Sequence, residues 1–169
     1  ISFVDVGHGD GAVITSKRRT FVIDLGDTYF DMGNYLIANG IKELEGVVIS
    51  HAHKDHHGGL EKLLSQIEVK KVYLNQETLE VVGPLLEAAE TEFLVVDQPM
   101  QIKCGSIQME ITPFFSATET NDNMLFVILS LEDIRGDFTG DLHKEKLSQF
   151  SNRGNLTFIK VPHHGSKTS

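Results

Sequence analysis

Four potential metal ligands stand within six residues of this chain: His51, His53, Asp55 and His56. His51 and His53 are one residue apart and can converge on one ion, while Asp55 and His56 can turn towards a neighbouring ion. The spacing therefore suits two adjacent divalent cations and favours a metal-dependent hydrolase. A solvated polar turn is the alternative interpretation, and the flanking segments decide between the two.

The segments on either side of this run favour a site. Residues 46–50 (Gly-Val-Val-Ile-Ser) form a short apolar run with β-branched side chains, which is typical of a buried strand. Gly58 and Gly59 indicate a turn, and the apolar residues after them predict an amphipathic helix at Leu60–Gln66. The ligands then lie in a loop after the carboxyl end of a strand, where α/β proteins usually build their sites.

The rest of the chain reads mainly as short strands, opening with an antiparallel meander. Strands are expected at Ser2–Val6, Ala12–Thr15, Thr20–Asp24, Val69–Leu74, Phe93–Val96, Ile107–Thr112, Met124–Leu131, Gly136–Thr139 and Leu156–Val161. Further helices are expected at Gly33–Ala38, Thr78–Glu90 and Lys144–Phe150. This alternation favours an α/β fold of mixed sheets with helices outside.

Composition sets the limits of the interpretation. A chain of 169 residues, 40% of them hydrophobic, is long enough for one core and predicts a single domain over residues 1–169. It contains no secretory leader and no apolar run of membrane-spanning length, so we expect a soluble fragment without membrane contact of its own. The fragment could be cytoplasmic or an extracytoplasmic domain of a membrane-attached parent protein. Its oligomeric state is open.

Five motifs spread over nearly the whole chain carry a family resemblance. They are Asp-Val-Gly-His-Gly-Asp at 5–10, Asp-Leu-Gly at 24–26, His-Ala-His-Lys-Asp-His-His-Gly-Gly at 51–59, Phe-Thr-Gly-Asp at 138–141 and His-His-Gly-Ser at 163–166. The third motif resembles the signature of the metallo-β-lactamase superfamily. Taken together, the five resemble the hydrolase domain of ComEC-type competence DNA-uptake proteins and their soluble relatives more closely.

The resemblance implies an αββα sandwich, with two mixed sheets facing each other, helices outside and a dinuclear metal site on the rim. It assigns Asp141 as the carboxylate that bridges both ions and His164 as a ligand of the second ion. His163 is then a supporting donor or general acid, although which of the two histidines binds metal is open. Asp55 is expected to serve catalysis as well as metal binding. Asp24 matches an aspartate that supports the site loop.

Several further residues lie in or beside these motifs. His57 replaces an apolar residue of the motif and could support the ligands, as could Ser166. His8 stands where related sequences carry Gln and is expected to be structural or to face solvent. Asp141 could also cap the helix expected near Lys144.

The sequence departs from the superfamily pattern in two ways. Residues 112–123 contain no His, although many relatives supply a third imidazole to the first ion from this stretch. Asp122 or Asn123 could supply an oxygen instead, which would move the metal preference from zinc towards manganese or magnesium. The chain also begins inside a strand and stops at 167–169, which predicts truncation at the C-terminus and a longer parent protein.

These features predict a hydrolase with two divalent ions, zinc or manganese, acting on a phosphodiester. DNA, single-stranded above all, is the substrate that the resemblance implies. The net charge of −9 and the lack of Trp oppose a broad nucleic-acid surface, so a polyanion would be held mainly at the metals. The alternatives are a hydrolase of small phosphoesters or other small substrates, and an inactive metal-binding domain with a structural or partner-binding role.

Overall fold

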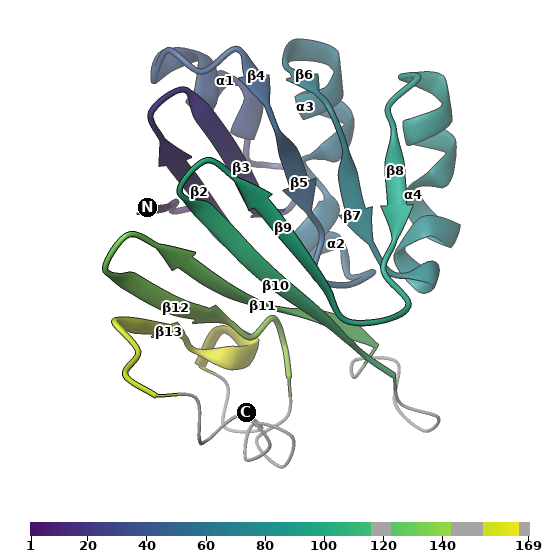
Figure 1. The fold of residues 1–169 in the computed structure, drawn as a ribbon. Coiled ribbons are helices and arrows are strands. Elements are labelled where there is room, and N and C mark those ends of the chain that lie inside the picture. The colour runs from purple at the N-terminus through teal and green to yellow at the C-terminus, as the bar shows by residue number, and fades with distance from the viewer. Residues whose placement is uncertain (116–122, 143–153, 166–169) are drawn as a thin grey trace. The chain divides into compact units, whose positions relative to one another are not determined.

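The computed structural model describes residues 1–115, 123–142 and 154–165. By its internal contacts the chain forms two compact units, Ile1–Val95 and Val96–Ser169, each with its own sheet (Figure 1). No helix in the described ranges is long and apolar enough to cross a membrane.

The first unit is built on a six-stranded sheet with the order β1-β2-β3-β5-β7-β8. Its strands are β1 (Ser2–Phe3), β2 (Gly11–Ser16), β3 (Arg19–Leu25), β5 (Gly46–Val48), β7 (Val72–Leu74) and β8 (Phe93–Val95). Two short strands, β4 (Glu43–Leu44) and β6 (Glu68–Val69), pair separately. The helices are α1 (Met32–Ala38), α2 (Lys54–His57), α3 (Leu60–Gln66) and α4 (Gln76–Ala88).

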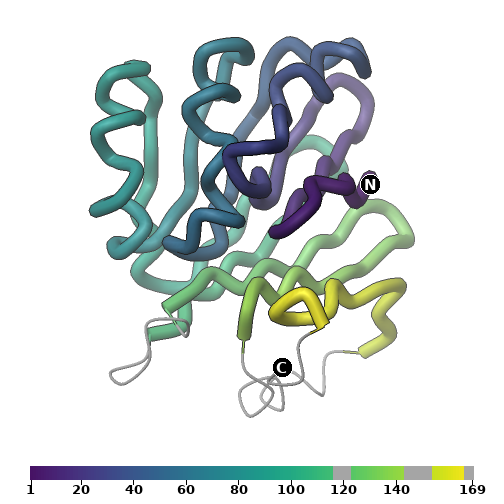
Figure 2. Tube along the Cα trace, turned by 180° about the vertical axis from the view of Figure 1, so that it is seen from behind, coloured from purple at the N-terminus to yellow at the C-terminus, as the bar shows by residue number. Residues whose placement is uncertain are grey.

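The pairing pattern of this sheet explains where polar loops collect. Strands β1 to β3 form the predicted antiparallel meander, whereas β3, β5, β7 and β8 run parallel. Helices α1, α3 and α4 lie on one face of the sheet (Figure 2), and their apolar residues share a core with the strands. Because carboxyl ends of parallel strands meet at one edge, the segments after β3 and β5 come together there.

The second unit contains a five-stranded sheet with the order β13-β12-β11-β10-β9. Its strands are β9 (Met100–Cys104), β10 (Ile107–Phe114), β11 (Met124–Leu131), β12 (Ile134–Phe138) and β13 (Phe158–Lys160). Only β12 and β13 pair in parallel. A Cβ at Gly136 would overlap the ring of Phe158 on the neighbouring strand, so any larger residue there would require that ring to move. The carboxyl ends of this pair lead into residues 139–141 and 161–165.

Most of the expected elements are present, and two have the predicted bounds, β11 and α3. The single strand expected at Val69–Leu74 is wrong. It divides into β6 and β7, because Lys70 donates its backbone N–H to Leu44 while Val72 begins to pair with β5. Strands β4 and β9 were not predicted, and residues 54–57 form a helical turn where a loop was expected. The helix expected at 144–150 lies outside the described residues.

Candidate metal centre

Asp24, at the carboxyl end of β3, organises the predicted metal loop. Its buried carboxylate accepts hydrogen bonds from the backbone N–H of Ser50 (2.7 Å), the hydroxyl of Ser50 (2.8 Å) and Nδ1 of His56 (2.9 Å). Burial opposes ionisation, but the attraction of His56 and the bonds from His56 and Ser50 outweigh it and hold the pKa of Asp24 below its ordinary value. Asp24 is therefore an ionised anchor for the loop.

The contact with Asp24 also determines how His56 presents its ring. A carboxylate can only accept, so the proton of neutral His56 lies on Nδ1 and the lone pair on Nε2. This Nε2 lies 3.8 Å from Oδ2 of Asp55. Two ligands of one tetrahedral ion, each about 2.1 Å from the metal, lie about 3.4 Å apart. His56 and Asp55 are therefore close to the spacing that a shared ion requires.

Three imidazoles of the loop are packed together. The ring centroid of His51 lies 4.0 Å from that of His56 and 4.7 Å from that of His53. His51 is buried, and its Nδ1 lies 3.0 Å from the hydroxyl of Ser50. The same hydroxyl lies 3.2 Å from Nδ1 of His56, so Ser50 contacts Asp24 and two of the imidazoles at once, a role that its sequence context did not reveal.

A glycine-rich loop at residues 7–10 lies against the metal loop. The backbone N–H of Asp10 donates to the carbonyl of Asp55 (3.3 Å), and Gly9 has a φ of +114° with no room for a Cβ beside that carbonyl. The side chain of Asp10 approaches Nδ1 of His56 at 3.8 Å. His8 is largely exposed, as expected, yet its Nε2 lies 3.3 Å from Oδ2 of Asp55. Sequence reasoning gave Asp10 no role, although its place in a motif shared with ComEC-type proteins was a usable signal.

His57 supports the same loop from the side. Its Nε2 lies 3.1 Å from the carbonyl oxygen of Ala52, so a proton on Nε2 donates to the residue between His51 and His53. Burial lowers the pKa of His57 from its ordinary 6.5, which favours the neutral ring. His57 therefore contacts the loop backbone rather than the ligand atoms.

The second unit brings together its own set of predicted ligands. Buried Asp141 places Oδ1 3.8 Å from Nε2 of His164 and Oδ2 4.0 Å from Nε2 of His163. Both histidines have left-handed backbone angles, with φ of 47° and 50°, and the N–H of His163 donates to the carbonyl of Gly140 (3.1 Å). The carboxylate therefore has an imidazole near each oxygen, and the geometry leaves open which histidine is a ligand.

Of the remaining predicted residues, the structure describes only Asn123. Asn123 is partly buried just before β11, and its role as a ligand stays a prediction. Asp122 and Ser166 lie outside the described residues.

The donor sets fit divalent transition metals. Imidazole nitrogen and carboxylate oxygen are ligands of zinc and manganese, and metal-binding histidines commonly donate their other ring N–H to a carboxylate, as His56 does to Asp24. An anchored loop also holds the ligands in place before an ion arrives. The structure therefore describes two groups of residues, one in each unit, whose chemistry suits a metal centre.

Comparison with known proteins agrees with the fold and with the motifs. The family model described as anti-Pycsar protein Apyc1 matches residues 4–131, well over half of the chain. The chain is 26% identical to ComE operon protein 3 of Bacillus subtilis (strain 168), in an alignment that covers 100% of this chain and 26% of that protein. The predicted relationship to ComEC-type proteins is thereby confirmed, and the chain spans only a part of that relative.

Solved structures confirm the predicted metallo-β-lactamase fold. The metallo-β-lactamase fold protein YhfI from Bacillus subtilis has a TM-score of 0.67 at 14% identity, covering 89% of this chain and 61% of that chain. A diphosphatase from the PhnP family has a TM-score of 0.57 at 14% identity, covering 89% of this chain and 58% of that chain.

Proposed function

The chain belongs to the family of the anti-Pycsar protein Apyc1 and has the metallo-β-lactamase fold, and on this premise we propose that it is a metal-dependent hydrolase of phosphodiester bonds. Its proposed substrate is DNA, single-stranded above all. The relationship to ComE operon protein 3 supports a nucleic-acid substrate, because the motifs shared with ComEC-type proteins run through nearly the whole chain. The proposal treats the two units as halves of one hydrolase domain.

One observation carries the metal-dependent part of the proposal. Ionised Asp24 holds His56 in the tautomer whose Nε2 lone pair is directed to the region of the Asp55 carboxylate. A histidine fixed in this way is the arrangement found at metal sites, where the supporting carboxylate raises the basicity of the ligand.

We assign two ions to the site. His51, His53 and Asp141 are the proposed protein ligands of one ion, and Asp55, His56, His164 and Asp141 those of the other. The first ion then has fewer protein ligands, unless Asp122 or Asn123 supplies an oxygen. Zinc suits the imidazoles and manganese tolerates the added oxygens, so both metals fit the donor set.

The protein side chains have separate tasks in this mechanism. Bound divalent ions would lower the pKa of a water molecule and offset the negative charge that develops on the phosphoryl oxygens. Asp24 and Ser50 hold the imidazoles of His51 and His56 in place. His163, beside Asp141, is the proposed proton donor to the leaving oxygen.

A second candidate is the hydrolysis of small phosphoesters. The net charge of −9 favours it, because an acidic protein attracts a long polyanion weakly over most of its surface. The structural similarity to a PhnP-family diphosphatase is compatible with it but shows the fold alone.

A substrate panel tests the proposal. Protein loaded with manganese or zinc is incubated with single-stranded DNA, duplex DNA, bis-p-nitrophenyl phosphate and p-nitrophenyl phosphate, the last being a monoester. We expect single-stranded DNA to be degraded faster than the monoester is hydrolysed. Rapid monoester turnover without nicking of DNA at low salt would favour the small-phosphoester candidate, and inactivity of the fully metal-loaded protein on every phosphoester would contradict both.

A further inference from the structure

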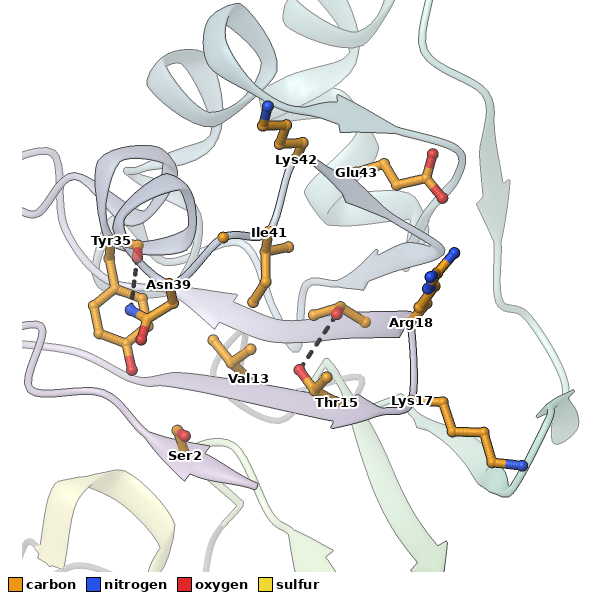
Figure 3. Close-up of a pocket in the computed structure, with 12 residues that line it drawn as sticks. Ser2, Val13, Thr15, Lys17, Arg18, Tyr35, Asn39, Ile41, Lys42 and Glu43 are labelled. Carbon is orange, nitrogen blue, oxygen red and sulfur yellow. Dashed lines mark hydrogen bonds between the residues drawn. The ribbon is translucent and has the colours of Figure 1, made fainter.

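The first unit contains a cavity of about 700 Å³ that the metal centre does not use. It is lined by the β2–β3 turn, the end of α1 and the segment that leads into β4. Figure 3 shows Lys17 and Arg18 at one end of the cavity and Tyr35 and Asn39 at the other, with Val13 between them. Its volume lies within the range of sites that bind small molecules.

The charge of this cavity is opposite to that of the chain. Three cationic residues line it, Lys17, Arg18 and Lys42, and the single acid among the lining residues is Glu43. Glu43 forms an ion pair with Lys70, which is not among the lining residues: its Oε1 lies 3.5 Å from Nζ of Lys70. Within the described ranges, none of the three lining cations forms an ion pair with an acidic side chain. A protein of net charge −9 therefore concentrates unneutralised positive charge here.

The turn that carries two of these cations is unusual for its residue types. Lys17 and Arg18 form a two-residue loop between β2 and β3, and Lys17 has a φ of +57°. Asn and Gly are the residues that such a loop favours, because positive φ strains other side chains. Here the residue with positive φ is Lys17, and Arg18 follows it directly.

Strand β3 connects this cavity to the metal loop. Thr20 lines the cavity, while Asp24, four residues further along the same strand, anchors His56. At about 3.3 Å per residue, the two positions are about 13 Å apart along the strand. Because β3 is buried, a nucleic acid would pass over the surface between the two positions, and with a phosphate every few ångströms several nucleotides cover this path.

We propose that this cavity binds the phosphates of a single-stranded nucleic acid, as a second contact for the strand whose cleavage is proposed above. The inference rests on that proposed function. Lys17, Arg18 and Lys42 contact the phosphates, and Tyr35 offers an aromatic wall against which a base packs. The sequence showed no aromatic residues interleaved with basic ones, because the fold gathers these residues from positions 17, 18, 35 and 42.

Binding to metal-free protein tests this site separately from catalysis. A fluorescent 20-nucleotide single strand is titrated in the presence of a chelator with the wild type and with the variant Lys17→Ala/Arg18→Ala/Lys42→Ala. We expect the variant to bind at least about 10-fold more weakly, and the slope of log K against log salt to fall by about 2, since each phosphate contact contributes about 0.7. The matched control is Lys62→Ala/Lys71→Ala/Lys103→Ala, which changes the net charge equally and should keep the wild-type slope.

The outcomes separate the two proposals. If the strand binds through the three cations but metal-loaded protein cleaves no DNA, the proposed function fails and the binding site stands. If the wild type cleaves DNA and the triple variant binds with the wild-type affinity and slope, the binding site fails and the function stands. An equal loss of affinity in the control, or a mononucleotide bound as tightly as the 20-mer, would also overturn the assignment to a strand.

Discussion

The carboxylate of Asp24 and the imidazole of His56 meet in the interior of the first unit, with Oδ2 2.9 Å from Nδ1, although 32 residues separate them in the chain. The contact exists because β3 and β5 are parallel neighbours and both end at the same edge of the sheet. The metal loop is therefore held by the sheet itself, before any ion is bound.

Replacing this anchor should weaken both folding and metal binding. In Asp24→Asn, the amide cannot accept from all three donors that the carboxylate satisfies, so at least one buried donor loses its acceptor. We expect the free energy of unfolding to fall by about 3 kcal/mol and the metal affinity to fall about 10–100-fold. Urea unfolding and calorimetric titration measure the two effects. Asp133→Asn, at an exposed position, is the control and should change neither.

The same carboxylate predicts a pH dependence. The pKa of Asp24 is lower in the folded protein than its ordinary 3.8. Its stabilisation is therefore complete above pH 3.8 and is lost as the pH falls through the lowered value. Urea midpoints of metal-free protein between pH 6 and pH 2 should show an acid-dependent loss in the wild type that is smaller in Asp24→Asn. Parallel pH profiles for the two proteins would contradict the assignment of an ionised anchor.

His57 predicts a second pH effect at milder acidity. Because burial lowers its pKa below 6.5, the unfolded chain takes up the proton first, and stability falls as the pH drops from about 6.5 towards the folded value. His57→Gln keeps an N–H that can donate to the carbonyl of Ala52 but does not titrate. The loss of stability of metal-free protein between pH 7.5 and pH 5.5 should therefore be smaller in the variant. If the variant and the wild type lose the same amount of stability between pH 7.5 and pH 5.5, His57 is not responsible for the pH effect.

The glycine-rich loop offers a matched pair of substitutions. A Cβ at Gly9 would overlap the backbone of Asp55, whereas a Cβ at Gly7 would meet nothing within 4 Å. Both residues have positive φ, so each alanine costs about 1 kcal/mol of backbone strain. We expect Gly7→Ala to retain metal affinity, and Gly9→Ala to lose it at least about 10-fold, because the metal loop must move. Calorimetric titration of both variants compares them, and equal affinities would contradict the packing of the two loops.

Asp141→Asn should remove hydrolysis while leaving the fold intact. The substitution deletes the charge proposed to bridge the ions and changes the side-chain volume little. Replacing a residue that only supports metal ligands lowers metal affinity or activity about 10–100-fold. Because Asp141 is itself a proposed ligand, we expect the rate with bis-p-nitrophenyl phosphate to fall by more than about 100-fold. Circular dichroism and thermal unfolding verify the fold. Wild-type turnover by the folded variant at saturating metal would refute the dinuclear mechanism.

The two ions should differ in affinity. The ion assigned to His51, His53 and Asp141 has fewer protein ligands than its neighbour, so stepwise chelation should remove it first and leave a nearly inactive protein with one ion. Excess manganese should restore activity better than zinc, because a harder cation accepts water and oxygen ligands more readily. Calorimetric titration of metal-free protein measures the two affinities. Two equal, tight, zinc-selective sites would mean that another nitrogen ligand completes the first site.

The local signals in the sequence were sufficient for some elements and not for others. Strand β11 and helix α3 were predicted with the observed bounds, because uninterrupted apolar and amphipathic patterns determine them. The run at 69–74 divides because its two halves pair in different sheets, β6 with β4 in a two-stranded sheet and β7 with β5 in the six-stranded sheet, which no local pattern reveals. Likewise the hydroxyl of Ser50 gains its contacts only when β3 and β5 lie side by side.

At His163 and His164 the left-handed backbone costs stability, while the two imidazoles lie beside Asp141. Glycine would adopt these angles without strain, and each non-glycine residue there costs about 1–2 kcal/mol. Glycine at either position would therefore relieve this strain, but each such substitution would remove an imidazole beside Asp141. We therefore expect relatives that keep the activity to retain histidine at these two positions despite the cost in stability. In relatives that have lost the activity, we expect glycine to replace these histidines.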